Sequence, residues 1–231
     1  MITGKNFFSL QDDAHYLNCA YMAPLSKRVV EAGRRAMERL QHPSRIGVVD
    51  FFDPAMRVRR LFAEIINAPD PHRIAIIPAV SYGMATVARN TPLRATQHVV
   101  MVEEQFPSAV YTWHRACNAR GASLRIVKAP TTSPSRGSAW NDTLLGAIDE
   151  GTAAVIIPEF HWTDGLRFDL KAIRTKTLNV GALLIVDGTQ SIGAHPFDVL
   201  HVRPDALICA GYKWLTGPYG LGLAYFGEIF D

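Results

Sequence analysis

Two charged residues each follow a short apolar run, and together they could carry covalent chemistry. Asp187 ends the run Leu183 to Val186, and Lys213 follows the run Ala206 to Ala210 after a Gly-Tyr pair. A strand of a parallel sheet is buried on both faces and reads as an unbroken apolar run, and ligands bind where such strands end. The pattern therefore predicts that Asp187 and Lys213 meet at the carboxyl edge of one parallel sheet.

A lysine amine in such a place could form a Schiff base with a carbonyl compound. Its surroundings must first lower its pKa, because only the neutral amine is a nucleophile. Pyridoxal phosphate is the usual carbonyl partner, and its pyridine nitrogen needs a nearby carboxylate to stay protonated. Asp187 fits that need, and Gln190, three residues on, can donate a hydrogen bond to the ring oxygen. Taken alone, Asp187 is more simply interpreted as a helix cap after a strand.

Three motifs around these residues follow one another in the order VDGTQSIG, PFDV and GYKWLTGPYGLG. In this order and spacing they resemble the class V family of fold type I pyridoxal phosphate enzymes, which includes cysteine desulfurases, selenocysteine lyases, kynureninases, aminotransferases and epimerases. The resemblance implies that Lys213 forms the aldimine with pyridoxal 5'-phosphate and that Asp187 pairs with the ring nitrogen. It also implies that Gln190 contacts the phenolate oxygen of the cofactor.

The composition is that of a globular protein without nucleic-acid-binding character. Of the 231 residues, 48% are hydrophobic and 19% are charged, and the net charge is only +3. The sequence contains no dense Lys/Arg run, no basic leader with an apolar core and no apolar stretch of membrane-spanning length. Its cysteines, Cys19, Cys117 and Cys209, lack the spacing of a zinc site. We therefore expect a cytoplasmic protein in a reducing compartment, with no metal, nucleic acid or membrane partner.

The alternation of apolar runs and helical segments predicts one α/β structural unit. Residues 1–70 are expected to form an N-terminal arm and two amphipathic helices, the first capped by Ser26 and the second opened by Asp53-Pro54. Residues 71–231 are expected to form the cofactor-binding large domain. Fold type I members have a three-layer, doubly wound, mostly parallel seven-stranded sheet with an antiparallel last strand, and this sequence offers seven strand candidates. In the second helix, the expected buried stripe is Val58, Leu61, Phe62 and Ile65.

A phosphate is expected at the start of the helix that follows the first strand of the large domain. Amides and dipole at a helix N-terminus favour an anion, and Ser81 adds a hydroxyl there. The family cradles the cofactor phosphate at this turn, so the resemblance places Val80 and Ser81 in the phosphate site. Many relatives carry two threonines here, and the pair Val80-Ser81 therefore predicts a weaker hold on the phosphate. The simpler interpretation of Ser81, a helix cap, is compatible with this role.

Aromatic residues follow two further apolar runs. By resemblance, Phe106 in the segment EEQFPS stands where the family stacks an aromatic ring or a histidine on the cofactor. Cysteine desulfurases usually have a histidine there, which can move protons, so Phe106 argues against classical desulfuration. The alternative for Phe106 is a core aromatic. Trp162 and Tyr212 are further cofactor-binding candidates by resemblance, whereas His161 is secondary because a lone histidine at a strand end is more often packed in the core.

The N-terminal arm is expected either to line the substrate side of the site or simply to pack against the domain. By resemblance to the YLN segment of relatives, the residues concerned are Asn18, Cys19 and Ala20. Fold type I sites are normally completed between two subunits, and exposed apolar surface favours association. We therefore expect a homodimer.

The resemblance implies a pyridoxal-phosphate-dependent enzyme acting on an amino acid, either an aminotransferase or a Cβ–S lyase of the desulfurase kind. Relatives continue beyond the position of Asp231 into a small C-terminal domain that this sequence lacks. That domain supplies a substrate-binding arginine and, in desulfurases, a loop with the nucleophilic cysteine. The sequence could thus be a fragment or a natural short form, and the alternative function is a truncated cofactor-binding or dimerising remnant without turnover.

Overall fold

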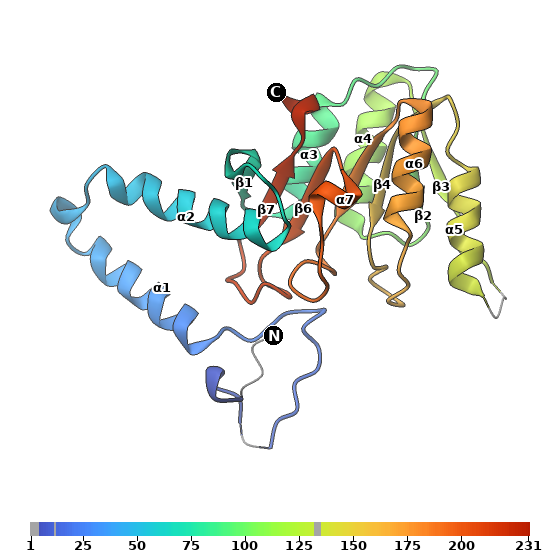
Figure 1. Ribbon diagram of the computed structural model, residues 1–231. Helices are drawn as coiled ribbons and strands as arrows, with labels where there is room; N and C mark the ends of the chain where they lie inside the picture. Colours follow the sequence, from blue (N-terminus) through green and yellow to red (C-terminus); the bar gives the residue numbers. More distant parts are fainter. Residues whose placement is uncertain (1–4, 12, 132–134) are drawn as a thin grey trace.

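The strands form one mixed sheet in the computed structural model, which describes residues 5–11, 13–131 and 135–231 (Figure 1). Along this sheet the strand order is β1-β7-β6-β5-β4-β2-β3. β7 runs antiparallel to both of its neighbours, β1 and β6, while the other pairs are parallel. The predicted seven-stranded, mostly parallel sheet with an antiparallel last strand is confirmed. The strands are β1 (Ile74–Ile77), β2 (His98–Val102), β3 (Ser123–Val127), β4 (Thr152–Pro158), β5 (Leu183–Asp187), β6 (Ala206–Ala210) and β7 (Gly222–Phe226).

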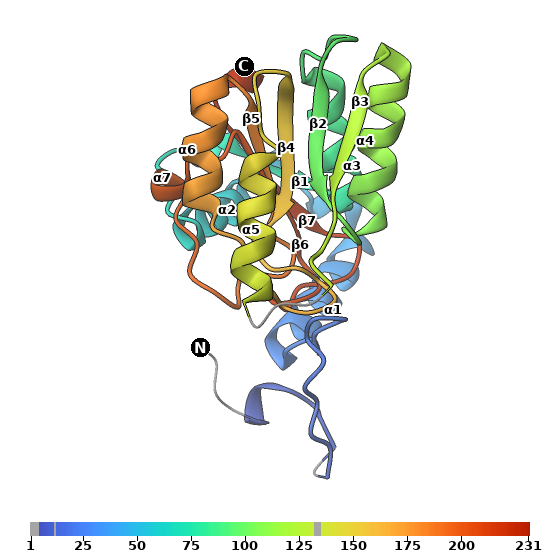
Figure 2. The same cartoon turned by 90° about the vertical axis from the view of Figure 1, so that its right-hand side faces the viewer.

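Helices cover both faces of the sheet, so the predicted three-layer arrangement is confirmed (Figure 2). Successive strand residues point into opposite cores: Leu184 packs into one and Ile185 into the other. One face is covered by α3 (Val80–Asn90) and α4 (Pro107–Arg120), and the other by α2 (Val49–Ile65), α5 (Arg136–Gly146), α6 (Leu170–Val180) and α7 (Val199–Val202).

The chain reverses its direction of winding between β2 and β4. From β2 the chain continues outward to β3 at the sheet edge, whereas from β4 it continues through β5 to β6 on the other side. In doubly wound sheets, the crevice outside the carboxyl ends of the strands at such a point is the usual ligand site. The segments that follow β2 and β4 are therefore placed to line a site.

Of the two N-terminal helices, only the last turns of α2 pack on the sheet. α1 (Lys27–Leu40) projects away from it and buries none of its residues (Figure 1). As predicted, Ser26 caps this helix by accepting a hydrogen bond from the Val29 amide at 3.3 Å. In α2 only Phe62 and the alanine after it are buried. Leu61 and Ile65, expected in the buried stripe, are 49% and 50% exposed, because only one side of the last turns meets the sheet.

The start of α2 differs from the prediction. The helix begins at Val49, so Asp53 does not cap it and Pro54 lies inside the helix. Asp50 in the first turn accounts for the earlier start, because its carboxylate reaches back to accept a hydrogen bond from the Gly47 amide at 2.8 Å, as the acidic residue of a capping box does. Among the described residues, no helix is both long and apolar enough to cross a membrane.

The loops after β5 and β6 pack directly against each other. Gly193 has a φ of +96°, and a Cβ there would lie 2.6 Å from the carbonyl oxygen of Trp214. The indole Nε1 of Trp214 donates a 3.0 Å hydrogen bond to Oε1 of Gln190. The amide of Ala210 donates to Oγ1 of Thr189 at 3.3 Å. These contacts fix the position of the loop that carries Lys213 relative to the end of β5.

We expect Gly193→Ala to lower the free energy of unfolding by about 1–3 kcal/mol, because a side chain there combines left-handed strain with a backbone clash. Chemical denaturation measures this loss. Gly146→Ala, at the end of α5, is the matched control: its Cβ would meet no heavy atom within 4 Å. Its effect should stay within about 0.5 kcal/mol. Equal losses of unfolding free energy in the two variants would contradict the importance of the close approach between Gly193 and Trp214.

Candidate active site

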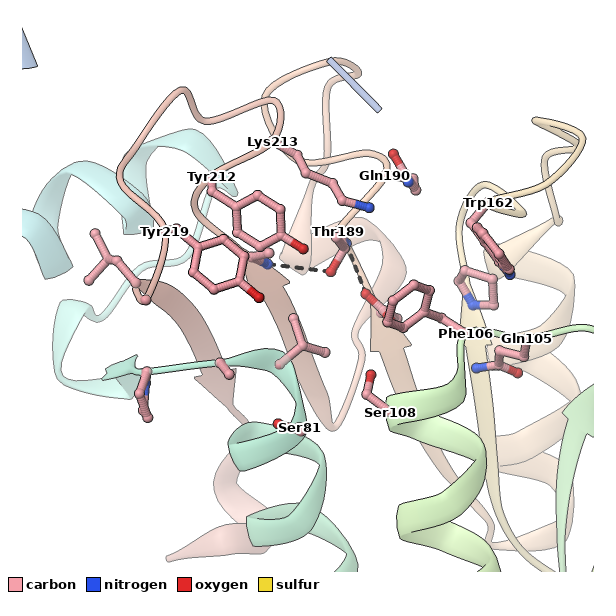
Figure 3. A pocket seen from close by; sticks show the side chains of 18 of the residues that line it. Ser81, Gln105, Phe106, Ser108, Trp162, Thr189, Gln190, Tyr212, Lys213 and Tyr219 are labelled. Atoms are coloured by element: carbon pink, nitrogen blue, oxygen red, sulfur yellow. Dashed lines mark hydrogen bonds between the residues drawn. The ribbon is translucent and has the colours of Figure 1, made fainter. Parts of the chain in front are cut away.

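A cavity of about 200 Å³ lies at the carboxyl ends of the parallel strands (Figure 3). Segments after β1, β2, β4, β5 and β6 line it, together with the turn before β7. In Figure 3, Lys213 and Gln190 extend from one side of this space, and Ser81 and Phe106 from other sides. The structure brings into this one cavity all the residues expected from the sequence to hold a cofactor: Val80, Ser81, Phe106, Trp162, Asp187, Gln190, Tyr212 and Lys213.

Asp187 ends β5 and is 7% exposed. Burial raises the pKa of its carboxyl group, while hydrogen bonds from Thr189 and the charge of Lys213 oppose this rise. Oδ1 of Asp187 accepts the Thr189 amide at 3.0 Å. A turn rather than a helix follows, so Asp187 does not act as a helix cap. The carboxylate is thus held at the cavity wall, where a cationic group of a ligand would stabilise its charge.

Lys213 is also buried, with 7% of its surface exposed. Burial lowers the pKa of its amine, and the charge of Asp187 partly offsets this effect. Its Nζ lies 5.7 Å from the ring centroid of Phe106. The turn before Lys213 requires a glycine, because a Cβ at Gly211 would lie 2.8 Å from the carbonyl oxygen of Leu221. The lowered pKa favours the neutral, nucleophilic form of the amine.

The N-terminal arm reaches the mouth of the cavity through backbone atoms. The carbonyl oxygen of Ala20 accepts a 3.1 Å hydrogen bond from Nε2 of Gln190, and the amide of Ala23 donates to the carbonyl of Tyr212 at 3.0 Å. Of the three arm residues expected on the substrate side, only Ala20 contacts Gln190 in this way. Asn18, Cys19 and Ala20 do not line the cavity itself.

Two aromatic rings meet at the point where the winding reverses. Phe106 follows β2, Trp162 follows β4, and their rings are in edge-to-face contact with centroids 5.4 Å apart. Phe106 is 39% exposed, so the alternative of a core aromatic is wrong. The indole N–H of Trp162 donates to the carbonyl of Glu104 at 2.6 Å. The pair forms an aromatic wall of the cavity.

His161 lies in the core and not in the cavity. It is 1% exposed and packs against the rings of Trp140 and Phe168, with centroids 5.0 and 6.5 Å away. Its Nε2 is 3.1 Å from the carbonyl oxygen of Glu103, which can only accept a hydrogen bond. The packed interpretation of His161 therefore holds. His161 and Trp162 thus hydrogen-bond to the backbone carbonyls of Glu103 and Glu104 in the turn between β2 and α4.

The start of α3 faces the cavity without a side-chain cap. Ala79 is the N-cap residue, and its side chain makes no capping hydrogen bond. Ser81 lies in the first turn, so its interpretation as the cap is wrong. Because the first amides of a helix lack intrahelical partners, this end is open to an anion.

Four polar residues of the cavity wall were missed in the sequence. Thr189 lies inside the quoted motif, between two residues that were singled out, and its spacing alone could have identified it. The ring of Tyr219 contacts that of Tyr212 at 4.6 Å, and burial raises the pKa of the Tyr212 hydroxyl. No local pattern distinguishes Gln105 and Ser108 from ordinary residues at or just before a helix start. The missed residues are Gln105, Ser108, Thr189 and Tyr219.

Comparison with known proteins gives consistent matches. The family model for class V aminotransferases matches residues 22–229. The chain is 29% identical over 167 residues to YcbU, an uncharacterized aminotransferase of Bacillus subtilis. This alignment covers 72% of this chain and 43% of YcbU. The chain is also 26% identical over 223 residues to a cysteine desulfurase of Shigella sonnei. That alignment covers 92% of this chain and 53% of the relative.

A solved structure has the same fold. It is a C-DES mutant with glycine covalently linked to the PLP cofactor, and it superimposes with a TM-score of 0.83 at 21% identity, covering 94% of this chain and 57% of the other. The chain spans about half the length of the relatives that it matches. The fold expected from the sequence is confirmed, and pyridoxal phosphate, the expected cofactor, is the cofactor of this family. Because the family model matches nearly the whole chain, this protein belongs to the class V aminotransferase family.

Proposed function

We propose that this chain binds pyridoxal 5'-phosphate and forms the cofactor-binding half of an enzyme that acts on an amino acid, an aminotransferase or a Cβ–S lyase related to cysteine desulfurases. The observation that carries the proposal is the burial of Asp187 and Lys213 in one cavity at neighbouring strand ends. When bound, the cofactor supplies an electron sink for bonds at the amino-acid Cα.

The residues present fit this cofactor. The buried carboxylate of Asp187 suits a protonated pyridine nitrogen, since burial makes an unpaired charge costly. The uncapped start of α3 suits a phosphate, with Val80 and Ser81 at hand. Phe106 offers a ring to stack on the pyridine. Each part of the cofactor thus has a partner of suitable chemistry.

In this proposal, two residues manage protons and two orient the ring. Asp187 holds the proton on the ring nitrogen. Lys213 attaches the cofactor and, once its amine is free, takes the Cα proton of the substrate, for which its lowered pKa suits it. Gln190 donates to the ring oxygen, and Phe106 stacks without ionising. Since Phe106 cannot move a proton, the proposal favours chemistry other than classical desulfuration.

One observation favours the alternative, a cofactor-binding or dimerising remnant without turnover. Among the described residues, those that line the cavity include no arginine that could bind a substrate carboxylate. Cofactor binding without substrate turnover would support this second candidate.

We further propose that the protein forms a homodimer through its N-terminal part. α1 has no buried residue, and the surface around α1 and α2 exposes large apolar side chains. Association would cover exposed apolar side chains that include Leu17, Met37, Leu40, Val48, Phe51 and Phe52.

Borohydride reduction in the presence of pyridoxal phosphate should fix the cofactor on Lys213, because its amine is buried and its pKa lowered. Peptide mass spectrometry locates the label. Lys213→Ala should bind the cofactor only non-covalently. Lys171→Ala, at an exposed lysine of α6, should be labelled like the wild type. A label on any other lysine would refute the assignment.

Asp187→Asn should fold but exchange the Cα proton of a bound amino acid at least about 100-fold more slowly, measured by deuterium exchange. Without cofactor it should be as stable as the wild type or more so, because a costly buried charge is removed. A raised carboxyl pKa also means that the cofactor-free wild type loses stability as pH rises from the ordinary aspartate value through the raised one. The asparagine variant should lack this loss. Full exchange activity would show that Asp187 is structural.

Sedimentation over a concentration series should show a dimer that dissociates on dilution. If the dimer completes the cofactor site, cofactor absorbance should fall in parallel with dissociation. Phe51→Asp with Phe52→Asp should weaken association, whereas Tyr111→Asp, an exposed aromatic on α4, should not. A monomer with full cofactor occupancy at every concentration would refute the proposal.

A further inference from the structure

Both ends of the Gln190 amide are held by other parts of the chain. Nε2 donates to the backbone carbonyl of Ala20 at 3.1 Å, and Oε1 accepts from the indole Nε1 of Trp214 at 3.0 Å. Gln190 also lines the cavity. Its amide is therefore a bridge between the N-terminal arm, the loop after β6 and the ligand space.

The chemistry of the two partners determines which end of the amide faces which partner. An indole N–H can only donate, so the atom opposite Trp214 must be the amide oxygen. A backbone carbonyl can only accept, so the atom opposite Ala20 must be the amide nitrogen. The two constraints agree, and they settle an orientation that is otherwise a matter of assignment for glutamine.

We propose that Trp214 is a positioning residue that keeps an N–H of Gln190 available to the ligand. The amide nitrogen carries two hydrogens, and one of them is donated in the hydrogen bond to the carbonyl oxygen of Ala20. The second can donate to an oxygen in the cavity. This inference rests on the proposed function, in which that acceptor is the ring oxygen of pyridoxal phosphate. Without the indole N–H, only the hydrogen bond to Ala20 would orient the amide, so the amide would be held less firmly with its second N–H toward the cavity.

The placement of Trp214 suits this role. It follows Lys213 directly, and its carbonyl packs against Gly193, three residues after Gln190. The residue that orients the amide is thus covalently next to the residue that would attach the cofactor. A change in the position of one loop is transmitted to both contacts with the ring.

The test is Trp214→Phe, which keeps an aromatic ring and removes the N–H. We expect cofactor binding, measured by titration of the visible absorbance, to weaken about tenfold, since a hydrogen bond to a charged oxygen is lost. The pH at which the absorbance of the bound cofactor changes should rise, because the donor stabilises the ionised oxygen. Unchanged affinity and an unchanged midpoint would overturn the proposal.

Trp113→Phe is the matched control. The Trp113 indole is fully buried in α4, and its Nε1 has no hydrogen-bond partner among the described residues. The substitution makes the same chemical change without removing a hydrogen bond, so it should leave the midpoint unchanged. A shift as large as that of Trp214→Phe would show a general effect of losing an indole and overturn the proposal.

A double-mutant cycle separates positioning from packing. Gln190→Leu should weaken binding as much as Trp214→Phe or more, and the double variant should match Gln190→Leu alone. Additive losses would overturn the proposal. Should Trp214→Phe fail to fold, hydrogen exchange of the Trp214 indole decides: its N–H should be protected in the wild type and lose protection in Gln190→Leu. Equal protection in both also overturns it. Failure of the proposed function is recognised separately, because Lys213 would then not be labelled.

Discussion

The site depends on two ionisable groups, one acidic and one basic, that are buried together at the ends of adjacent parallel strands. Removing an ionised group from water costs several kcal/mol even after relaxation. The pKa of Asp187 is raised and that of Lys213 lowered, both mainly by burial, so each group is moved toward its neutral form. A ligand with a cationic nitrogen and a reactive carbonyl would satisfy both. A cofactor that pairs with both groups would therefore offset the cost of their burial.

The sheet topology divides the cavity into two kinds of wall. β5 and β6 deliver the charged and amide groups, and their loops are joined by the contact of Gly193 with Trp214. β2 and β4, where the winding reverses, deliver Phe106 and Trp162. In the proposed function, the polar wall would contact the heteroatoms of a flat ring and the aromatic wall would cover its face. Reaction type would then depend on groups added to this platform.

Local pattern predicts the sheet and the strand ends that carry Asp187 and Lys213, whereas most other cavity residues were expected from the resemblance to the class V family. Unbroken apolar runs identify the strands, and the residues at their ends must meet at one edge, as with Asp187 and Lys213. The misplaced start of α2 has a different cause: the Asp50 side chain outweighs the usual preference for proline in a first helical turn. His161 and Trp162 also show the limit: Trp162 lines the cavity while His161, one residue before it, is buried in the core, and local sequence does not reveal which of the two faces the cavity.

The attachment of the N-terminal arm has a consequence for how this segment can change during evolution. The arm meets the cavity through the carbonyl oxygen of Ala20 and the amide of Ala23. Main-chain atoms are present whatever the side chain, so substitutions at these positions preserve both contacts. The exception is proline at position 23, because proline has no amide hydrogen to donate. An insertion or deletion between them would change the spacing and break one contact. The segment is therefore constrained in length more than in composition.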